Sequence, residues 1–197
     1  MLIQVVHCHP LTDSFDHALY LAILEALRAG GHDVVGTDLY RENFPPALTE
    51  QERRSYMSND FRPEGTERYI DILRSLEGIV FCFPHWWFSM PAMLKGYFDR
   101  VWAPGTAFVY DKYGQLEPNL RHIRFLAVVT SFGSPWWFER LLAGNPGRKV
   151  FRYAIEPLCA KGVKSWWMAL HGMDKASDEK RTAFLTEVRD RFRRLPV

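Results

Sequence analysis

The sequence contains little cysteine and no long hydrophobic run. Its three cysteines, Cys8, Cys82 and Cys159, are odd in number and form no C-x-x-C pair. This pattern excludes a disulfide framework, is typical of a reducing compartment, and predicts small buried side chains. No apolar run approaches the length of a membrane span, and the first residues lack the charged start and apolar centre of a signal peptide. We therefore expect a cytoplasmic protein without membrane insertion.

The charged residues form no basic stripe. The chain has 25 Lys and Arg against 23 Asp and Glu, a formal net charge of +2, and the two signs are interspersed. Binding to a phosphate backbone requires clustered basic residues, so we do not expect a nucleic-acid partner. A one-electron carrier that docks through a strongly acidic surface is disfavoured by the same balance.

Aromatic residues, in contrast, are abundant. They make up 15% of the 197 residues and include seven Trp, whereas the 47% hydrophobic and 24% charged content is ordinary for a globular protein. The length suits one well-buried domain, so we predict a single domain over 1–197. The aromatic excess indicates a flat ligand or a large interface.

Strand-like and helix-like segments alternate along the chain. Five short apolar runs predict buried strands at 2–7, 32–39, 78–84, 123–131 and 163–170. Helical patterns begin at Phe15, at about 66, near Ser89 and Pro91, at 149 with a bend near Pro157, and at 177. Parallel crossovers are long and right-handed, so this alternation predicts an α/β fold: a flavodoxin-like, doubly wound five-stranded parallel sheet with helices on both faces.

Residues 41–65 interrupt this alternation. The segment is polar, rich in proline and long for a plain connection. It is either a solvated surface excursion or a lid or subunit contact.

In an open α/β sheet, ligands bind beyond the carboxyl ends of the strands, so the loops "CHPLTDS", "PHWWFS" and "TSFGSP" are the candidate sites. The first loop matches neither G-x-G-x-x-G nor a P-loop. It does offer the free amides of a helix start, which can bind one phosphate, although Asp13 or Ser14 can equally be a plain N-cap there.

Two other kinds of site are not supported. His7 and His9 flank Cys8, but two imidazoles without a third ligand at suitable spacing make a poor metal site, so we expect no metal. The chain also lacks the G-x-S-x-G elbow of serine hydrolases.

The second and third loops suit a flat ring. Trp86, Trp87 and Phe88 cannot all point into a core from a loop at the sheet edge, so they form either a platform for an aromatic ligand or a core or dimer contact. In the third loop the Thr130 and Ser131 hydroxyls and backbone amides supply hydrogen-bond donors. Such donors suit the polar edge of a flavin, which becomes negatively charged on reduction.

At these residues the chain resembles the NAD(P)H:quinone oxidoreductase family of flavodoxin-like flavoproteins. This group includes DT-diaphorase, modulator-of-drug-activity proteins and ancillary subunits of bacterial potassium-efflux systems. The resemblance is carried by "HPLTDSF", "DLY", "FPHWWFSMPAMLKGYFDRV" and "TSFGS", in order over most of 1–134.

The resemblance implies a flavin, NAD(P)H as co-substrate, a homodimer and ping-pong reduction of a quinone-like acceptor. It implies two groups of binding residues. The phosphate group is His9, Asp13, Ser14 and Phe15; the ring group is Pro84, His85, Trp86, Trp87, Phe88, Thr130, Ser131, Phe132 and Gly133.

The chain also departs from the family pattern. Phe138 and Gly144 stand where better-studied animal members have a tyrosine and a histidine that relay a proton, so His85 or water is the candidate for that role. Phe132 replaces a frequent glycine and is expected to narrow the space over the ring. Trp136 and Trp137 are expected to line the acceptor pocket, which leaves room for an acceptor other than a simple quinone.

Two alternatives stay open at this point. The cofactor is FAD or FMN, with FAD favoured because 41–65 offers surface beyond the ring and phosphate. The function is a reductase or, alternatively, a flavin-binding regulatory subunit of a membrane transporter or a redox sensor; no polybasic patch favours the second.

Overall fold

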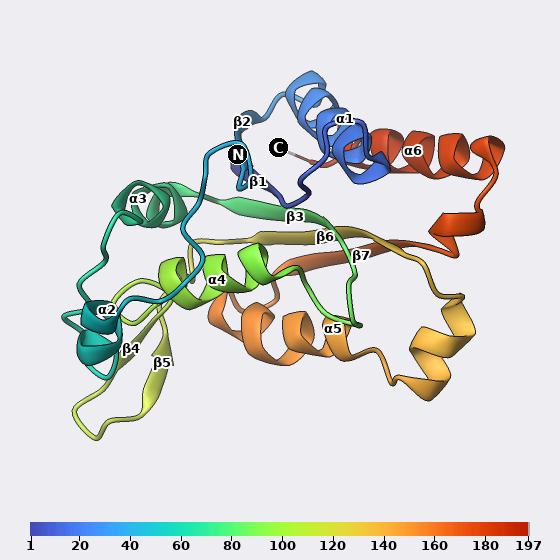
Figure 1. The fold of residues 1–197 in the computed structure, drawn as a ribbon. Helices are drawn as coiled ribbons and strands as arrows, with labels where there is room; N and C mark the ends of the chain where they lie inside the picture. Colours follow the sequence, from blue (N-terminus) through green and yellow to red (C-terminus); the bar gives the residue numbers. More distant parts are fainter. Residues whose placement is uncertain (197) are drawn as a thin grey trace.

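A five-stranded parallel sheet forms the centre of the molecule (Figure 1). The structure is a computed structural model that describes residues 1–196. The sheet has the order β2-β1-β3-β6-β7 and every neighbouring pair is parallel. Its strands are β1 Leu2–His7, β2 Asp33–Asp38, β3 Gly78–Pro84, β6 Phe125–Phe132 and β7 Lys164–His171. This is the strand order of the flavodoxin-like fold, so the predicted fold class is confirmed.

Helices cover both faces of the sheet (Figure 1). One face carries α1 Phe15–Ala29 and α6 Asp178–Arg193. The other carries α3 Glu67–Ser75, α4 Ala92–Val101 and the short α5 Pro146–Val150. Each face has its own apolar core, and both β3 and β6 are buried along their whole length. None of the helices in residues 1–196 is long and apolar enough to span a membrane.

The register places the carboxyl ends of four strands at one edge. His7 lies opposite both Asp38 on β2 and Cys82 on β3, and Pro84 lies opposite Ser131 on β6. The three cysteines are buried and free, as predicted. The loops that leave this edge are therefore held on a rigid, buried base.

Several boundaries differ from the sequence prediction. The fourth sheet strand begins at Phe125 instead of 123, and the predicted helix at 149–162 is split into α5, a π-helical turn η2 Phe151–Ile155 and a 3₁₀ turn η3 Glu156–Leu158. Pro157 lies within the last of these turns and cannot donate a backbone hydrogen bond, which fits the end of the helical segment there. A small antiparallel pair, β4 Phe108–Tyr110 and β5 Leu116–Pro118, was not predicted.

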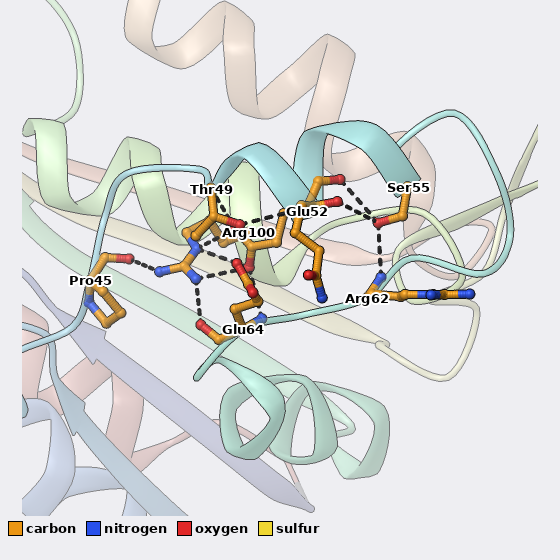
Figure 2. A network of polar contacts seen from close by, with 8 residues as sticks. Pro45, Thr49, Glu52, Ser55, Arg62, Glu64 and Arg100 are labelled. Carbon is orange, nitrogen blue, oxygen red and sulfur yellow. Dashed lines mark hydrogen bonds and ion pairs between the residues drawn. The ribbon is translucent and has the colours of Figure 1, made fainter.

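The 41–65 segment is anchored by a buried ion pair (Figure 2). It contains the short helix α2 Glu50–Ser55, and Glu52 within it is buried against Arg100 of α4. Arg100 Nε and Nη2 donate to the Glu52 carboxylate at 2.8–3.1 Å, and Nη2 also donates to the Glu64 carbonyl at 2.6 Å. Burial raises the pKa of Glu52, but hydrogen bonds from Arg100, Thr49 and Glu64 outweigh burial and hold the pKa below its ordinary value. The segment is therefore a fixed part of this face at Glu52 and Glu64, not a free excursion.

Candidate functional site

Three loops meet at the carboxyl edge of the sheet, as the strand order predicts. The His85 amide donates to the Ser131 carbonyl at 2.8 Å, which joins the second loop to the third. The Ser131 hydroxyl donates to Asp16 Oδ2 at 2.8 Å, which joins the third loop to the start of α1. The His9 and Trp86 rings lie 5.8 Å apart, which joins the first loop to the second. The structure therefore brings the three predicted loops into one site.

The first loop ends in a capped helix start. Ser14 is the N-cap of α1, and its hydroxyl oxygen accepts from the His17 amide at 3.1 Å. Phe15 and Asp16 follow it in the first turn, where backbone amides have no intrahelical acceptor. The Phe15 ring packs toward Phe184 of α6, 6.5 Å between centroids, so the backbone amide is the part of Phe15 that faces a ligand. Asp13 is exposed at the same turn.

His9 and His7 do not share a site. His7 is fully buried, whereas His9 is half-buried in the first loop, where Nδ1 accepts from the Leu11 amide at 3.0 Å. That hydrogen bond fixes His9 beside the helix start.

The second loop contains a strained turn. Trp86 and Ser89 exchange both backbone hydrogen bonds, at 3.1 and 3.0 Å, and the two residues between them have positive φ: 54° at Trp87 and 57° at Phe88. Positive φ at both central positions is the geometry for which Asn-Gly is preferred, and it costs a bulky L-residue about 1–2 kcal/mol. Strain of this kind persists where the surroundings enforce it and is concentrated at functional sites.

That turn holds its aromatic side chains outward. Trp87 is 97% exposed and Trp86 41% exposed. Phe88 is half-buried and stacks on Phe138, with centroids 5.6 Å apart. An almost fully exposed Trp on a strained turn contributes little to the core, so it fits a surface that another molecule covers.

An open cleft of about 390 Å³ lies beside the turn. Its lining comes from the second and third loops and from the segment after β7. The lining residues are Pro84, His85, Trp86, Trp87, Ser131, Gly133, Met173 and Asp174. The volume is in the range of small-molecule sites. Sequence reasoning missed Met173 and Asp174, although their place just beyond the carboxyl end of the fifth strand follows from the same edge rule.

Two residues of the third loop point inward. Thr130 is fully buried, and its hydroxyl donates to the Phe83 carbonyl at 2.6 Å. Phe132 is 2% exposed and stacks between His85, at 4.1 Å, and His171, at 4.8 Å. For both residues the backbone, not the side chain, is the part available to a ligand. Gly133 fills a tight place, since a Cβ there would lie 2.4 Å from Asp174 Oδ2.

His85 is a neutral, buried imidazole. Because Thr130 donates to Phe83, its oxygen accepts from His85 Nδ1, at 2.7 Å, so Nδ1 carries the proton. His85 Nε2 is buried and, within residues 1–196, has no hydrogen-bond partner. Burial first, and His171 second, lower the His85 pKa to about 3, so the ring is uncharged at neutral pH. In this geometry it orders the Thr130 loop and holds no imidazolium proton to donate.

Asp16 was not singled out from the sequence, yet it sits between the first and third loops. It is 4% exposed; Oδ2 accepts from Ser131, and Oδ1 has no partner among the described residues. Burial raises the Asp16 pKa to about 6, with the Ser131 hydrogen bond opposing the shift. Keeping this carboxylate charged in a buried place is costly, and the raised pKa reflects that cost.

Asp16→Asn is expected to stabilise the flavin-free protein at pH 8 by about 1–2 kcal/mol and to change little at pH 4.5. The folded state keeps the Asp16 proton up to about pH 6, whereas an unfolded chain releases it near pH 4. The contribution of protonated Asp16 to the stability of the folded state is therefore fully present below about pH 4 and is lost as the pH rises through 6. The asparagine removes the buried charge but adds an unpaired NH₂, which offsets part of the gain. Urea unfolding at both pH values measures the difference.

Asp71→Asn is the matched control, because Asp71 is 76% exposed in a surface pair. It should change stability by less than about 0.5 kcal/mol at either pH. Equal loss of stability by Asp16→Asn at both pH values would show that Asp16 is a hydrogen-bonding residue whose charge has no role.

The geometry fits a bound molecule that is flat at one end and anionic at the other. The exposed indoles and the cleft offer a surface for a planar ring, and the amides of the α1 first turn offer donors for a phosphate. The two parts are connected by the contact of His9 with Trp86.

Comparisons with known proteins support the fold. A family model described as flavodoxin-like fold matches residues 1–191. The uncharacterized NAD(P)H oxidoreductase YcaK of Escherichia coli (strain K12) is 39% identical over 108 residues, 54% of this chain and 55% of that protein. The ribosyldihydronicotinamide dehydrogenase [quinone] of Rattus norvegicus is 32% identical over 79% of this chain and 72% of its own.

A solved structure extends the similarity over nearly the whole chain. The NAD(P)H:quinone oxidoreductase from Methanothermobacter marburgensis is 26% identical with a TM-score of 0.82, covering 98% of this chain and 94% of its own. The chain spans about half the length of several curated relatives that it matches, 52% to 61%.

Proposed function

The chain belongs to the family of proteins with the flavodoxin-like fold, and on that basis we propose that it is an NAD(P)H-dependent flavin oxidoreductase that reduces quinones or similar two-electron acceptors. The observation that carries the proposal is the strained, outward-facing Trp87–Phe88 turn beside the cleft at the carboxyl edge of the sheet. The names of the relatives, NAD(P)H oxidoreductase, NAD(P)H dehydrogenase [quinone] and ribosyldihydronicotinamide dehydrogenase [quinone], support it.

The proposed flavin site combines the two groups of residues expected from the sequence. The α1 first-turn amides, with His9, Asp13 and Ser14 around them, bind the phosphate. Pro84, Trp86 and Trp87 support the ring, with the Ser131 to Gly133 backbone at its polar edge. The side chains of Thr130, Phe132 and His85 pack inward, so they hold the second and third loops in place from the core side.

When bound, the flavin supplies the redox chemistry: it takes two electrons from NAD(P)H and passes them to the acceptor that replaces it. The chain supplies the rest. Trp87 and Trp86 orient the ring, the third-loop amides stabilise charge at its edge, and both substrates use the same open cleft in turn.

We assign His85 a positioning role within the proposed site. Its neutral ring, held by Thr130 and stacked on Phe132, keeps the third loop at the sheet edge. Water reaching the open cleft is the proton source that this geometry favours, since His85 Nε2 faces Gly147: a Cβ there would lie 2.0 Å from that nitrogen.

We also propose a homodimer. Large apolar side chains are exposed beside the aromatic turn, on the segment that follows the third loop. They are Trp136, Trp137, Phe138, Leu141 and Leu142, between 37% and 69% exposed. A contiguous apolar surface of this kind favours an interface, and a second chain here would lie over the acceptor side of the cleft.

For the cofactor we propose FAD over FMN. The reason is the length of the 41–65 segment, which is anchored on Arg100 near the end of α4. Mass analysis of the flavin released by heat decides between the two.

Steady-state kinetics with NADH, NADPH and a soluble quinone such as menadione tests the proposed activity. The expected result is turnover with parallel double-reciprocal lines, because donor and acceptor share one site. A protein that binds flavin but does not transfer electrons from either nucleotide to any quinone would overturn the reductase and favour the regulatory alternative.

A further inference from the structure

Three polar side chains meet at the carboxyl end of β1, apart from the cleft. His7 is the last residue of β1, Asp38 is the last residue of β2 and its register partner, and His17 is in the first turn of α1. His7 is fully buried, Asp38 is 9% exposed and His17 is half-buried. One nitrogen from each imidazole and one carboxylate oxygen lie within 4.8 Å of one another.

The distances between the three ligand atoms can be compared with those in a tetrahedral metal site. His7 Nε2 and His17 Nδ1 are 3.3 Å apart, and His17 Nδ1 is 4.0 Å from Asp38 Oδ2. A tetrahedral zinc ion 2.0–2.1 Å from two nitrogens separates them by about 3.3–3.4 Å. The histidine pair therefore already has the required spacing, whereas the Asp38 oxygen has to approach His17 Nδ1 by roughly 0.6 Å and His7 Nε2 by up to roughly 1.4 Å.

Neighbouring groups orient the ligand atoms toward the common centre. His7 Nδ1 lies 3.3 Å from the Cys82 carbonyl, so it carries the proton and leaves the Nε2 lone pair free. The Tyr20 ring stacks on the His7 ring at 4.8 Å and 13°, which fixes its plane.

Asp38 is arranged in the same way. Its Oδ1 accepts from the Tyr40 and Arg41 amides at 3.1 and 3.2 Å, which leaves Oδ2 for the cluster. In protein metal sites the ligand side chains are usually oriented by hydrogen bonds to neighbouring groups that do not themselves bind the metal.

A plain hydrogen-bonded pair is the competing explanation. His17 Nδ1–H can donate to His7 Nε2, and nothing more is then needed for the imidazoles. That explanation leaves the charge of Asp38 without a partner: within the described chain its carboxylate has no ion pair to Lys or Arg, and His17 is its one candidate cation. Buried charges are normally paired or coordinate a metal.

We propose that His7, His17 and Asp38 bind one divalent transition-metal ion, zinc in the first instance, with water as the fourth ligand. Two imidazoles and a carboxylate suit zinc, whereas magnesium and calcium prefer oxygen ligands alone. The ion connects β1, α1 and β2 at the base of the first loop. The proposal does not depend on the flavin, since the three ligand side chains are not among the side chains assigned to the ring or the phosphate.

The test is titration of zinc into the full-length protein after treatment with a chelator, followed by calorimetry. The expected result is one site per chain with a micromolar or tighter Kd. At free zinc about 100-fold above Kd, Tm should rise by about 5 °C or more. Cobalt in place of zinc should give the visible ligand-field bands of a four-coordinate site.

His17→Ala and Asp38→Asn should each weaken zinc binding by more than about 100-fold, because loss of a neighbouring group that only orients a ligand already costs about 10–100-fold. Asp38→Asn keeps an oxygen for the Tyr40 and Arg41 amides, so folding is retained. His122→Ala is the matched control, since His122 is an exposed histidine that contacts the Leu73 carbonyl, and the zinc affinity of this variant should equal that of the parent.

Three outcomes overturn the site. One is no zinc binding tighter than millimolar. Another is a Kd that changes less than twofold in both His17→Ala and Asp38→Asn. The third is equal loss of affinity in His122→Ala, which would show binding to surface histidines in general.

Discussion

Replacing Trp87 by alanine is expected to weaken flavin binding by about 10- to 100-fold and to slow reduction of the bound flavin by NAD(P)H, with the fold retained. A planar ring stacked on an aromatic side chain gains about 1–3 kcal/mol, which corresponds to that range. Trp87 is 97% exposed, so its removal leaves no cavity in the core. Flavin content, the flavin Kd and the anaerobic rate of reduction measure the effect.

Two variants separate stacking from other causes. Tyr113→Ala removes a 74% exposed aromatic residue between β4 and β5, far from the cleft in sequence, and should leave flavin affinity unchanged. Trp87→Gly should lose flavin like Trp87→Ala but be more stable by about 1 kcal/mol, because φ of 54° suits glycine. Unchanged flavin content and rate in Trp87→Ala would assign Trp87 to an interface instead.

Arg100→Met is expected to destabilise the protein by about 3–5 kcal/mol. Arg100 is 1% exposed and Glu52 is fully buried, and their pairing is joined by hydrogen bonds to the Glu64 carbonyl and from the Thr49 amide (Figure 2). Removing one partner of a buried pair leaves the other charge without compensation, and this costs more than the pair contributes. Urea unfolding gives the free energy, and limited proteolysis shows whether cleavage concentrates in 41–65.

Lys95→Met on the same helix is the control. Lys95 pairs with Asp99 at i,i+4, but both are solvent-exposed. The expected change is below about 0.5 kcal/mol. A similar small change in Arg100→Met would contradict the view that this ion pair holds the segment on α4.

The central strands could be predicted from the sequence because they are buried on both faces. β1 and β3 are short and consist mostly of apolar, β-branched or aromatic residues, a pattern typical of such strands. The β4–β5 pair was missed because three-residue strands with half-exposed side chains have no such pattern. Glu52 was missed for a similar reason: a glutamate in a polar segment is ordinarily exposed, and its partner is 48 residues away.

The meeting of the three candidate loops was predicted through the strand-edge rule, which places loops but not side-chain directions. The rule correctly predicted that the loops containing His9, Trp86 and Ser131 meet. It did not show that Thr130 and Phe132 point inward, because that depends on the pleat at the end of β6. Nor did it show the positive φ of Trp87 and Phe88, since those residue types disfavour that conformation.

Asp16, His17 and Asp38 were missed because their roles depend on neighbours distant in the sequence. Asp16 contacts Ser131, 115 residues away, and is unusual only in being buried. His17 and Asp38 meet His7 only after β1, α1 and β2 have packed together. Residue spacing predicts elements, whereas clusters of this kind come from tertiary structure.

The most direct test of the central claim is the visible absorption spectrum of the purified protein, recorded before and after anaerobic addition of NADH or NADPH. We predict a yellow protein that bleaches with one of the two nucleotides and regains its colour when a quinone is added. A colourless protein that cannot be reconstituted with FAD or FMN would contradict the flavin site, and Trp86, Trp87 and Phe88 would then be interface residues.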